Sequence, residues 1–106
     1  MPKKSLEILT ESMFYVLMAL SAGPKCGADT AEFIRRKTEG RMRLGPATLY
    51  AILAKFEKEQ YIEELYAEGR KRTYQITGLG TRAYREEIQR LERCLTDARS
   101  EGGFPQ

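Results

Sequence analysis

The most regular hydrophobic pattern in the chain lies between Leu44 and Gln60. From Pro46 onward, apolar residues recur three or four positions apart, which predicts a helix with one buried face. Pro46 suits its first turn, because the first backbone N–H groups of a helix have no partner within it. Gly45 is an acceptable residue for the preceding N-cap position. The residues of the buried face are Leu49, Ile52, Leu53 and Phe56.

The opposite face of this predicted helix has unusually small side chains. They let a helix backbone approach a DNA groove closely, where alanine can contact thymine methyl groups and polar neighbours can bond phosphates or base edges. Alanine is also the strongest helix former, so this face alone leaves both interpretations open. Its residues are Ala47, Ala51, Ala54 and Lys58, with Thr48, Tyr50 and Lys55 at the edges.

A second apolar segment, residues 13–20, is hydrophobic on every side, which is typical of a helix that is buried all round. Thr10 can cap its start, and Gly23 with Pro24 ends it. We expect one face to pack on the domain's own core through Met13, Val16, Leu17 and Leu20. The other face needs a second partner, for which another copy of the chain is the simplest choice; its residues are Tyr15, Met18, Ala19 and Ala22.

Residues 27–38 predict a further helix, which Gly40 terminates. Its basic last turn, residues 35–37, stabilises the helix through its dipole, so we interpret this run as a solvated helix end rather than a DNA contact. Three short helices connected in this way predict a helix-turn-helix. The helix that begins at Pro46 is then the recognition helix.

The segment after the recognition helix predicts a β-hairpin. Its strands are residues 61–67 and 72–76, and residues 68–71 form a turn that Gly69 permits. A hairpin directly after a helix-turn-helix indicates a winged helix, so the fold class is mainly α with a small β-hairpin. Because Arg70 and Lys71 lie at the hairpin tip, we expect them to contact DNA rather than serve only solubility.

The last predicted helix begins near Thr77 and carries a coiled-coil seam, in which apolar residues alternate four and three positions apart. We expect the seam to pair with the first helix of a second copy or with its own twin. Cys94 flanks it and is interpreted as a small buried hydrophobe rather than a redox thiol. The seam residues are Tyr84, Ile88, Leu91, Leu95 and Ala98.

The expected organisation has three parts. A winged helix-turn-helix domain covers residues 1–76, and its first nine residues form a lead-in arm or a short helix. A C-terminal dimerisation helix covers residues 77–100, and a flexible tail covers residues 101–106.

Composition limits the function classes. The 106 residues suit one domain, and a net charge of +3 is only mildly basic. However, seven basic and two acidic residues lie between Arg35 and Lys58, and residues 70–72 add a second basic run, so positive charge is clustered. The chain has no histidine and two distant cysteines, which argues against a metal site, a cofactor and enzyme activity. It shows no signal peptide or membrane-length apolar run, so we expect a reduced, cytoplasmic setting.

Taken together, these motifs resemble the PadR family of transcriptional regulators over nearly the whole chain. Residues 45–50 (Gly-Pro-Ala-Thr-Leu-Tyr) and 56–62 are similar to the family's Pro-x-Thr-Leu-Tyr and its following Leu-Glu-x-x-Gly-Leu-Ile run. Residues 69–77 are similar to the wing pattern Gly-Arg-x-x-Lys-x-Tyr-x-Ile/Leu-Thr. Gly80 fits the x-x-Gly that opens the family's last helix.

The resemblance implies a winged-helix homodimer, usually a repressor, that swaps its terminal helix onto the partner. The single terminal helix resembles the smaller branch of the family, some members of which bind flat aromatic drugs between the protomers. We expect DNA contacts from Arg43, Pro46, Ala47, Thr48, Tyr50, Lys55, Arg70 and Lys71. The expected dimer interface is Tyr15, Met18, Tyr84, Ile88, Leu91 and Leu95. As the alternative to a filled interface, an effector pocket would involve Phe14, Tyr15, Met18 and Tyr84.

Some positions depart from the family pattern. Gly45 replaces a frequent serine, and residues 26–28 (Cys-Gly-Ala) stand where His-Gly-Tyr is frequent. Gln60 replaces the glycine after the recognition helix, so we expect a different exit from that helix. The chain has no tryptophan, which argues against a pocket that stacks ligands on indole rings.

The sequence therefore predicts a homodimeric DNA-binding regulator. Its two recognition helices would enter successive major grooves of a pseudo-palindromic operator, about 34–36 Å apart. The alternative is a protein-interaction module that uses the winged helix as a dimer scaffold, which the mild net charge and the acidic residues Glu63, Glu64 and Glu68 near the wing favour. That alternative predicts no salt-dependent DNA binding.

Overall fold

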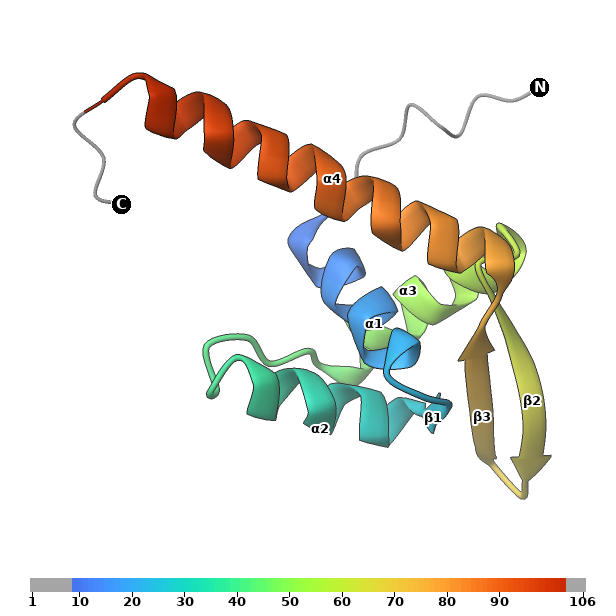
Figure 1. Ribbon diagram of the computed structural model, residues 1–106. Helices are drawn as coiled ribbons and strands as arrows, with labels where there is room; N and C mark the ends of the chain where they lie inside the picture. The colour runs from blue at the N-terminus through green and yellow to red at the C-terminus, as the bar shows by residue number, and fades with distance from the viewer. Residues whose placement is uncertain (1–8, 103–106) are drawn as a thin grey trace.

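The computed structural model describes residues 9–102, and it shows a mainly helical fold with a small antiparallel sheet (Figure 1). The prediction of a winged helix followed by a long terminal helix is confirmed. The predicted lead-in arm, apart from Leu9, and residues 103–106 of the predicted tail lie outside the described residues. In chain order the elements are α1 (Glu11–Ser21), β1 (Lys25–Cys26), α2 (Gly27–Lys37), α3 (Pro46–Lys58), β2 (Ile62–Glu68), β3 (Lys71–Ile76) and α4 (Gly78–Ser100).

The predicted helix starts are confirmed by their capping geometry. Thr10 precedes α1, and its Oγ1 accepts a hydrogen bond from the backbone N–H of Met13 at 3.1 Å. Thr77 precedes α4, and its Oγ1 accepts from the backbone N–H of Gly80 at 3.0 Å. Gly45 and Pro46 occupy the N-cap and first position of α3, as the sequence predicts.

The core is built around α1, which lies between α2 and α4 (Figure 1). The predicted inner face of α1 and the predicted buried face of α3 both pack into this core. The assignment of Ala19 to a face that needs a second copy is wrong, because Ala19 is 0% exposed in the single chain. Its own domain encloses more of α1 than the sequence pattern indicates.

The sheet contains a strand that the sequence analysis missed. Its strand order is β1-β3-β2, and the two residues of β1 pair with Thr73 and Tyr74 of β3. A strand of two residues shows no alternation, so only tertiary pairing reveals it. In the hairpin itself, the turn is reduced to Gly69 and Arg70, and Gly69 has a positive φ of 59°. A positive φ at the first turn position suits a type II′ hairpin turn, which explains the glycine.

The exit from α3 differs from our expectation. Gln60 adopts the left-handed conformation, with a φ of 64°, which is the conformation that glycine favours at this position. The backbone N–H of Tyr61 donates to Phe56 O at 2.9 Å, and that of Gln60 donates to Glu57 O at 3.0 Å. These two bonds form a Schellman motif, the usual end of a helix that is followed by glycine. Gln60 therefore preserves the exit that glycine would make, at the cost of backbone strain.

The two halves of α4 have different surroundings. The first half packs on α1, where the rings of Tyr84 and Phe14 lie 5.4 Å apart between centroids. The second half extends away from the domain, and every residue from Leu91 to Gly102 is exposed (Figure 1). Cys94, which we expected to be buried, is exposed in the single chain, because no other element among residues 9–102 covers this half of α4.

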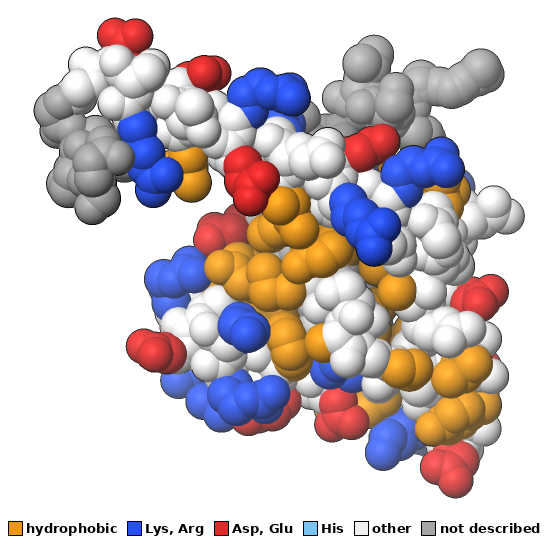
Figure 2. All heavy atoms as spheres, viewed as in Figure 1, with side chains coloured by type: hydrophobic (Ala, Val, Ile, Leu, Met, Phe, Trp, Pro, Cys, Tyr) orange, Lys and Arg blue, Asp and Glu red, His pale blue; other side chains and the backbone are white. Residues whose placement is uncertain are grey.

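Hydrophobic side chains also gather on the surface beneath α4, over α1 (Figure 2). Leu91 and Leu95 of the predicted seam are 37% and 46% exposed, and Ile88 is half-buried. Within residues 9–102, each helix is too short or too polar to cross a membrane.

Candidate nucleic-acid interface

The outward face of α3 presents small, uncharged side chains to solvent along its first turns. Pro46, Ala47, Thr48 and Ala51 are all exposed, whereas Leu49 on the other side is buried in the core. The spacing of hydrophobic residues in the sequence therefore predicts correctly which face of α3 is buried. A face of this kind can enter the major groove without steric obstruction by long side chains.

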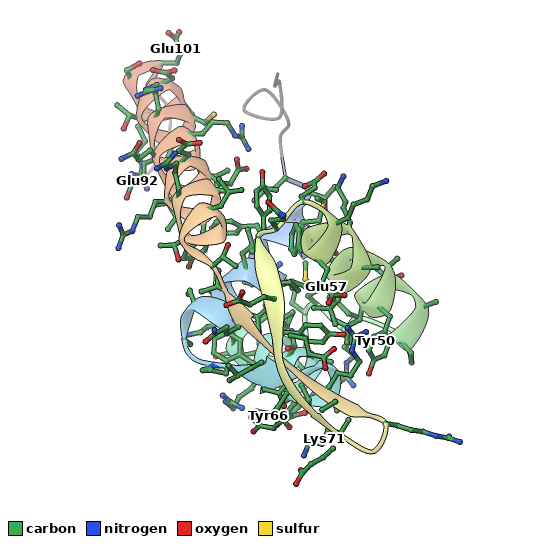
Figure 3. All side chains as sticks on the ribbon, turned by 90° about the vertical axis from the view of Figure 1, so that its right-hand side faces the viewer. Tyr50, Glu57, Tyr66, Lys71, Glu92 and Glu101 are labelled. Atoms are coloured by element: carbon green, nitrogen blue, oxygen red, sulfur yellow. The ribbon has the colours of Figure 1, made fainter. Side chains whose placement is uncertain are left out.

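Tyr50 lies on the side of α3 that faces α2 and the hairpin (Figure 3). A β-carbon on Gly27, the first residue of α2, would lie 2.6 Å from the Tyr50 hydroxyl oxygen. The ring therefore occupies space that only glycine leaves open. Tyr50 is still 52% exposed, so part of it remains available to a ligand.

The hairpin tip carries two cations whose charge is not neutralised. Arg70 and Lys71 are exposed, and neither forms an ion pair with another of the residues that the structure describes. Figure 3 shows Lys71 at the tip of the hairpin, and Figure 1 shows that this tip lies at the end of the molecule away from α4. These two side chains have the charge and the freedom to contact phosphates, as the sequence analysis expected.

Arg72, the next residue of the basic run, is placed quite differently. Its Nη2 donates to Glu57 Oε2 of α3 at 2.9 Å, and its Nε donates to Glu64 Oε1 of β2 at 2.6 Å. Its guanidinium also lies over the Tyr74 ring, 5.1 Å from the centroid. The hydrogen bond to Glu64 raises the pKa of Arg72 above its already high ordinary value, so the side chain stays charged. The basic run by itself did not separate Arg72 from its two neighbours.

A cavity of about 660 Å³ lies between the start of α2, Tyr50 and the hairpin tip. The N-terminus of α2 contributes the partial positive charge of a helix dipole, and Arg70, Lys71 and Arg72 contribute full charges. Asp29 is a carboxylate in the lining, and burial raises the pKa of the Tyr74 phenol, which keeps its proton. This chemistry suits an anion. Within residues 9–102, no cluster of three or more acidic or cysteine side chains could hold a metal ion.

The structure does not bring all predicted DNA contacts together. Lys55 is half-buried, and its Nζ forms a 3.0 Å ion pair with Glu59 Oε2 near the end of α3. Arg43 is exposed in the loop that leads into α3, and it does not line the cavity. The cavity joins Tyr50, Arg70 and Lys71, while the exposed α3 face carries Pro46, Ala47 and Thr48.

A second cavity, of about 350 Å³, lies between the start of α1 and α4. Phe14 and Tyr15 line it, as expected for an effector pocket, but Met18 and Tyr84 do not. Tyr84 instead packs against Phe14, outside this lining. The Tyr15 hydroxyl accepts a hydrogen bond from Arg41 Nη2 at 3.1 Å, which holds that ring from the side of the α2–α3 loop.

The same cavity contains an ion pair that the sequence analysis missed. Glu87 is buried, and both of its carboxylate oxygens accept from Arg90, at 3.0 Å from Nε and 2.6 Å from Nη2. The spacing of three positions within a helix is the signal that could have indicated this pair. It adds two charged groups to a lining that also contains the polar residues Thr10 and Glu11 beside Phe14, Tyr15 and two leucines.

The arrangement described above matches that of known regulators. The sequence pattern of the transcriptional regulator PadR-like family matches residues 16–86, which span the second half of α1, α2, the recognition helix, the wing and the first part of α4. An uncharacterised protein from Lysinibacillus sphaericus is 30% identical over 77 residues, which are 69% of this chain and 70% of that protein.

Solved structures agree with this match. A transcriptional regulator from Clostridium thermocellum, Cth-833, is 28% identical and has a TM-score of 0.74, over 87% of this chain and 92% of that one. The PcaV transcriptional regulator from Streptomyces coelicolor, solved with its natural ligand, shares the fold at a TM-score of 0.68 and 20% identity, over 82% of this chain and 58% of its own. Because the family pattern covers more than half of the chain, including the recognition helix and the wing, this protein belongs to the PadR-like family of transcriptional regulators.

Proposed function

We propose that the protein is a repressor that binds a pseudo-palindromic operator as a homodimer. The observation that carries this proposal is the joint placement of two features, the small-residue face of α3 and the cations at the hairpin tip, Arg70 and Lys71, which form no ion pair with another described residue. In this proposal α3 enters the major groove and reads base edges, while the wing holds the adjacent backbone. The protein carries out no catalytic step.

The cavity beside Tyr50 supports the proposal, because a backbone phosphate is an anion of suitable size and charge. The first residues of α2, at a helix N-terminus that favours anions, line this cavity together with Arg70 and Lys71. A phosphate held there would fix the register of α3 in the groove. Its affinity would depend on salt, because each neutralised phosphate releases counterions.

The exposed seam of α4 supports the homodimer. Leu91 and Leu95 are exposed on the second half of α4, and Leu91 also lines the cavity between α1 and α4. A second copy that supplied its own α4 would cover these side chains. The two recognition helices would then bind half-sites on one side of the duplex.

A small aromatic effector that releases DNA completes the proposal, and the cavity lined by Phe14 and Tyr15 is its proposed location. An effector can act only if it binds the DNA-bound and DNA-free dimers with different affinity. Calorimetric titration of aromatic compounds, with and without a bound operator duplex, would measure that difference. Equal affinity in both states would contradict a regulatory role for the cavity.

The main experiment is a titration of labelled DNA from the region upstream of the protein's own gene, at several salt concentrations, beside a scrambled duplex. We expect tighter binding to the native duplex and a linear fall of log affinity with log salt. Changing Arg70 and Lys71 to Ala should weaken binding to both duplexes and reduce the salt slope by about 2. Changing the exposed Arg82 and Arg85 of α4 to Ala removes the same charge away from the hairpin tip and serves as the control.

A protein-interaction module is the second candidate, because Leu65 and Tyr66 of the wing are 44% and 56% exposed. Apolar side chains on an exposed edge strand are suited to a protein partner. This candidate predicts equal, weak binding to the native and scrambled duplexes. It also predicts no salt-dependent DNA binding, so changing Arg70 and Lys71 to Ala should leave DNA binding unchanged.

A further inference from the structure

We propose that Arg72 is a positioning residue that fixes the wing relative to the recognition helix, and that it acts through Glu57 rather than by contacting DNA. This inference rests on the proposed DNA-binding function. The inference gives Arg72 a different role from Arg70 and Lys71, although the three residues form one basic run in the sequence.

The geometry places Arg72 at the junction of three elements. Its guanidinium bonds Glu57 on α3 at 2.9 Å and Glu64 on β2 at 2.6 Å, and it lies over the ring of Tyr74 on β3. The bond to Glu64 stays within the hairpin, but the bond to Glu57 crosses from the wing to the recognition helix. Figure 3 shows Glu57 on the side of α3 that faces the hairpin.

The local charge argues against a direct phosphate contact by Arg72. The positive charge of Arg72 and the two negative charges of Glu57 and Glu64 leave this group with a net charge of −1. To bond a phosphate, Arg72 would have to leave both carboxylates and expose them to the DNA. Arg70 and Lys71 have no such competing partners among the described residues.

The outer part of the wing also needs a contact that holds its orientation relative to α3. After Ile62, every residue of β2 is exposed, so the outer part of the hairpin has little buried surface to hold its direction. Beyond Thr73, where the pairing with β1 ends, the hairpin has only two strands, and a two-stranded hairpin alone is marginally stable in water. The Arg72–Glu57 bond joins this part of the hairpin to α3, and thereby sets how far the cations at the tip lie from the groove that α3 enters.

Glu57→Gln gives the sharpest test, because the two explanations predict opposite signs. Removing a carboxylate from a DNA-binding helix would strengthen binding if only charge mattered. If Glu57 holds Arg72, the variant should instead bind operator about two- to fivefold more weakly, which is the effect expected from losing a partly exposed ion pair. Glu64→Gln is the matched control, since it removes the same charge but leaves the ion pair between Arg72 and Glu57 of α3 in place. This variant should not weaken DNA binding.

Arg72→Ala separates positioning from phosphate contact through the salt slope. A phosphate contact would lower the slope by about 0.9, whereas a positioning residue lowers affinity at every salt concentration and leaves the slope unchanged. Arg72→Lys keeps the charge but cannot bridge two carboxylates with a rigid fork, so it should also weaken binding. If Arg72→Ala reduces the slope and Arg72→Lys restores it, Arg72 is a DNA contact and the inference is overturned.

Hydrogen exchange of the free protein makes the inference independent of any DNA result. We expect faster exchange of the hairpin amides in Glu57→Gln than in Glu64→Gln, with the amides of α1 unchanged as evidence that the core is intact. If the native protein bound no operator specifically, the proposed function would be wrong. Hydrogen exchange would still test whether the Arg72–Glu57 ion pair holds the hairpin. Equal hairpin exchange in Glu57→Gln and the native protein would contradict the positioning role.

Discussion

The hydroxyl of Tyr50 lies directly against Gly27. The recognition helix and the start of α2 therefore contact each other through the Tyr50 ring. A side chain as small as a methyl group on Gly27 would lie 2.6 Å from the Tyr50 hydroxyl oxygen and 2.8 Å from the ring carbon that bears it. The Tyr50 ring therefore lies in the wall of the cavity that Arg70, Lys71 and Arg72 also line. Its position depends on a glycine 23 residues earlier in the chain.

Gly27→Ala should weaken operator binding without destabilising the fold. The methyl group would move the Tyr50 ring, and losing one hydrogen bond to DNA would lower affinity about twofold to thirteenfold, on the basis of about 0.5–1.5 kcal/mol for such a bond. Alanine favours a helix, which offsets the cost of moving an exposed ring end. Operator titration and thermal unfolding measure the two effects. Tyr50→Phe removes only the hydroxyl and should cause a similar loss of affinity; unchanged binding in both variants would exclude a role for Tyr50.

Gly80→Ala should destabilise the protein, whereas Gly78→Ala should not. A β-carbon on Gly80 would overlap the backbone carbonyl of Tyr61, while a β-carbon on Gly78 meets nothing within 4 Å. We expect Gly80→Ala to cost about 1–3 kcal/mol, as overpacking does, because the overlap is with backbone. Gly78→Ala should raise stability by up to about 1 kcal/mol, since alanine suits a helix better. Urea unfolding of both variants measures the contrast, and equal effects would contradict the close approach of α4 to Tyr61.

Gln60→Gly should stabilise the protein. Gln60 has a φ of 64°, a conformation that costs about 1–2 kcal/mol for a residue with a β-carbon. Glycine removes this strain but adds chain freedom in the unfolded state, so the expected net gain in unfolding free energy is about 0.5–1 kcal/mol. Gly69→Ala, at a φ of 59°, introduces the same strain and should lower stability. A loss of stability in Gln60→Gly would mean that the Gln60 side chain stabilises the fold in some other way.

Placing aspartates on the α4 seam should abolish the proposed dimer. Leu91→Asp with Leu95→Asp puts two charges on the apolar stripe that extends beyond the domain, and burying them in an interface would be costly. We expect a monomer by light scattering and a loss of operator affinity of about a hundredfold or more, because the second half-site no longer adds to binding. Gln89→Asp with Thr96→Asp adds the same charge at exposed positions off the stripe and should remain dimeric. A dimer that persists in the Leu91 and Leu95 variant would place the interface elsewhere.

Much of the fold could be predicted because its signals are local. The apolar period of α3 identified its buried face, and Thr10 and Thr77 marked helix starts that the hydrogen bonds confirm. The two residues of β1 carried no such signal, since a strand that short exists only through its pairing with β3. The exit at Gln60 was misjudged for a related reason. The hydrogen bonds and ring contact that close α3 hold a glutamine in a glycine conformation.

The residue types of the candidate site could be predicted from the sequence, but the contacts that these side chains make could not. The sequence by itself determined the helices, the wing, the small face of α3 and the cluster of basic residues, because each follows from neighbours a few positions apart. Only the tertiary structure decided that Arg70 and Lys71 are left without partners among the described residues, that Arg72 is held by Glu57 and Glu64, and that Tyr50 lies against Gly27. The physical reason is that an ion pair or a steric contact depends on which elements approach one another, and residues distant in sequence meet only after the helices have packed.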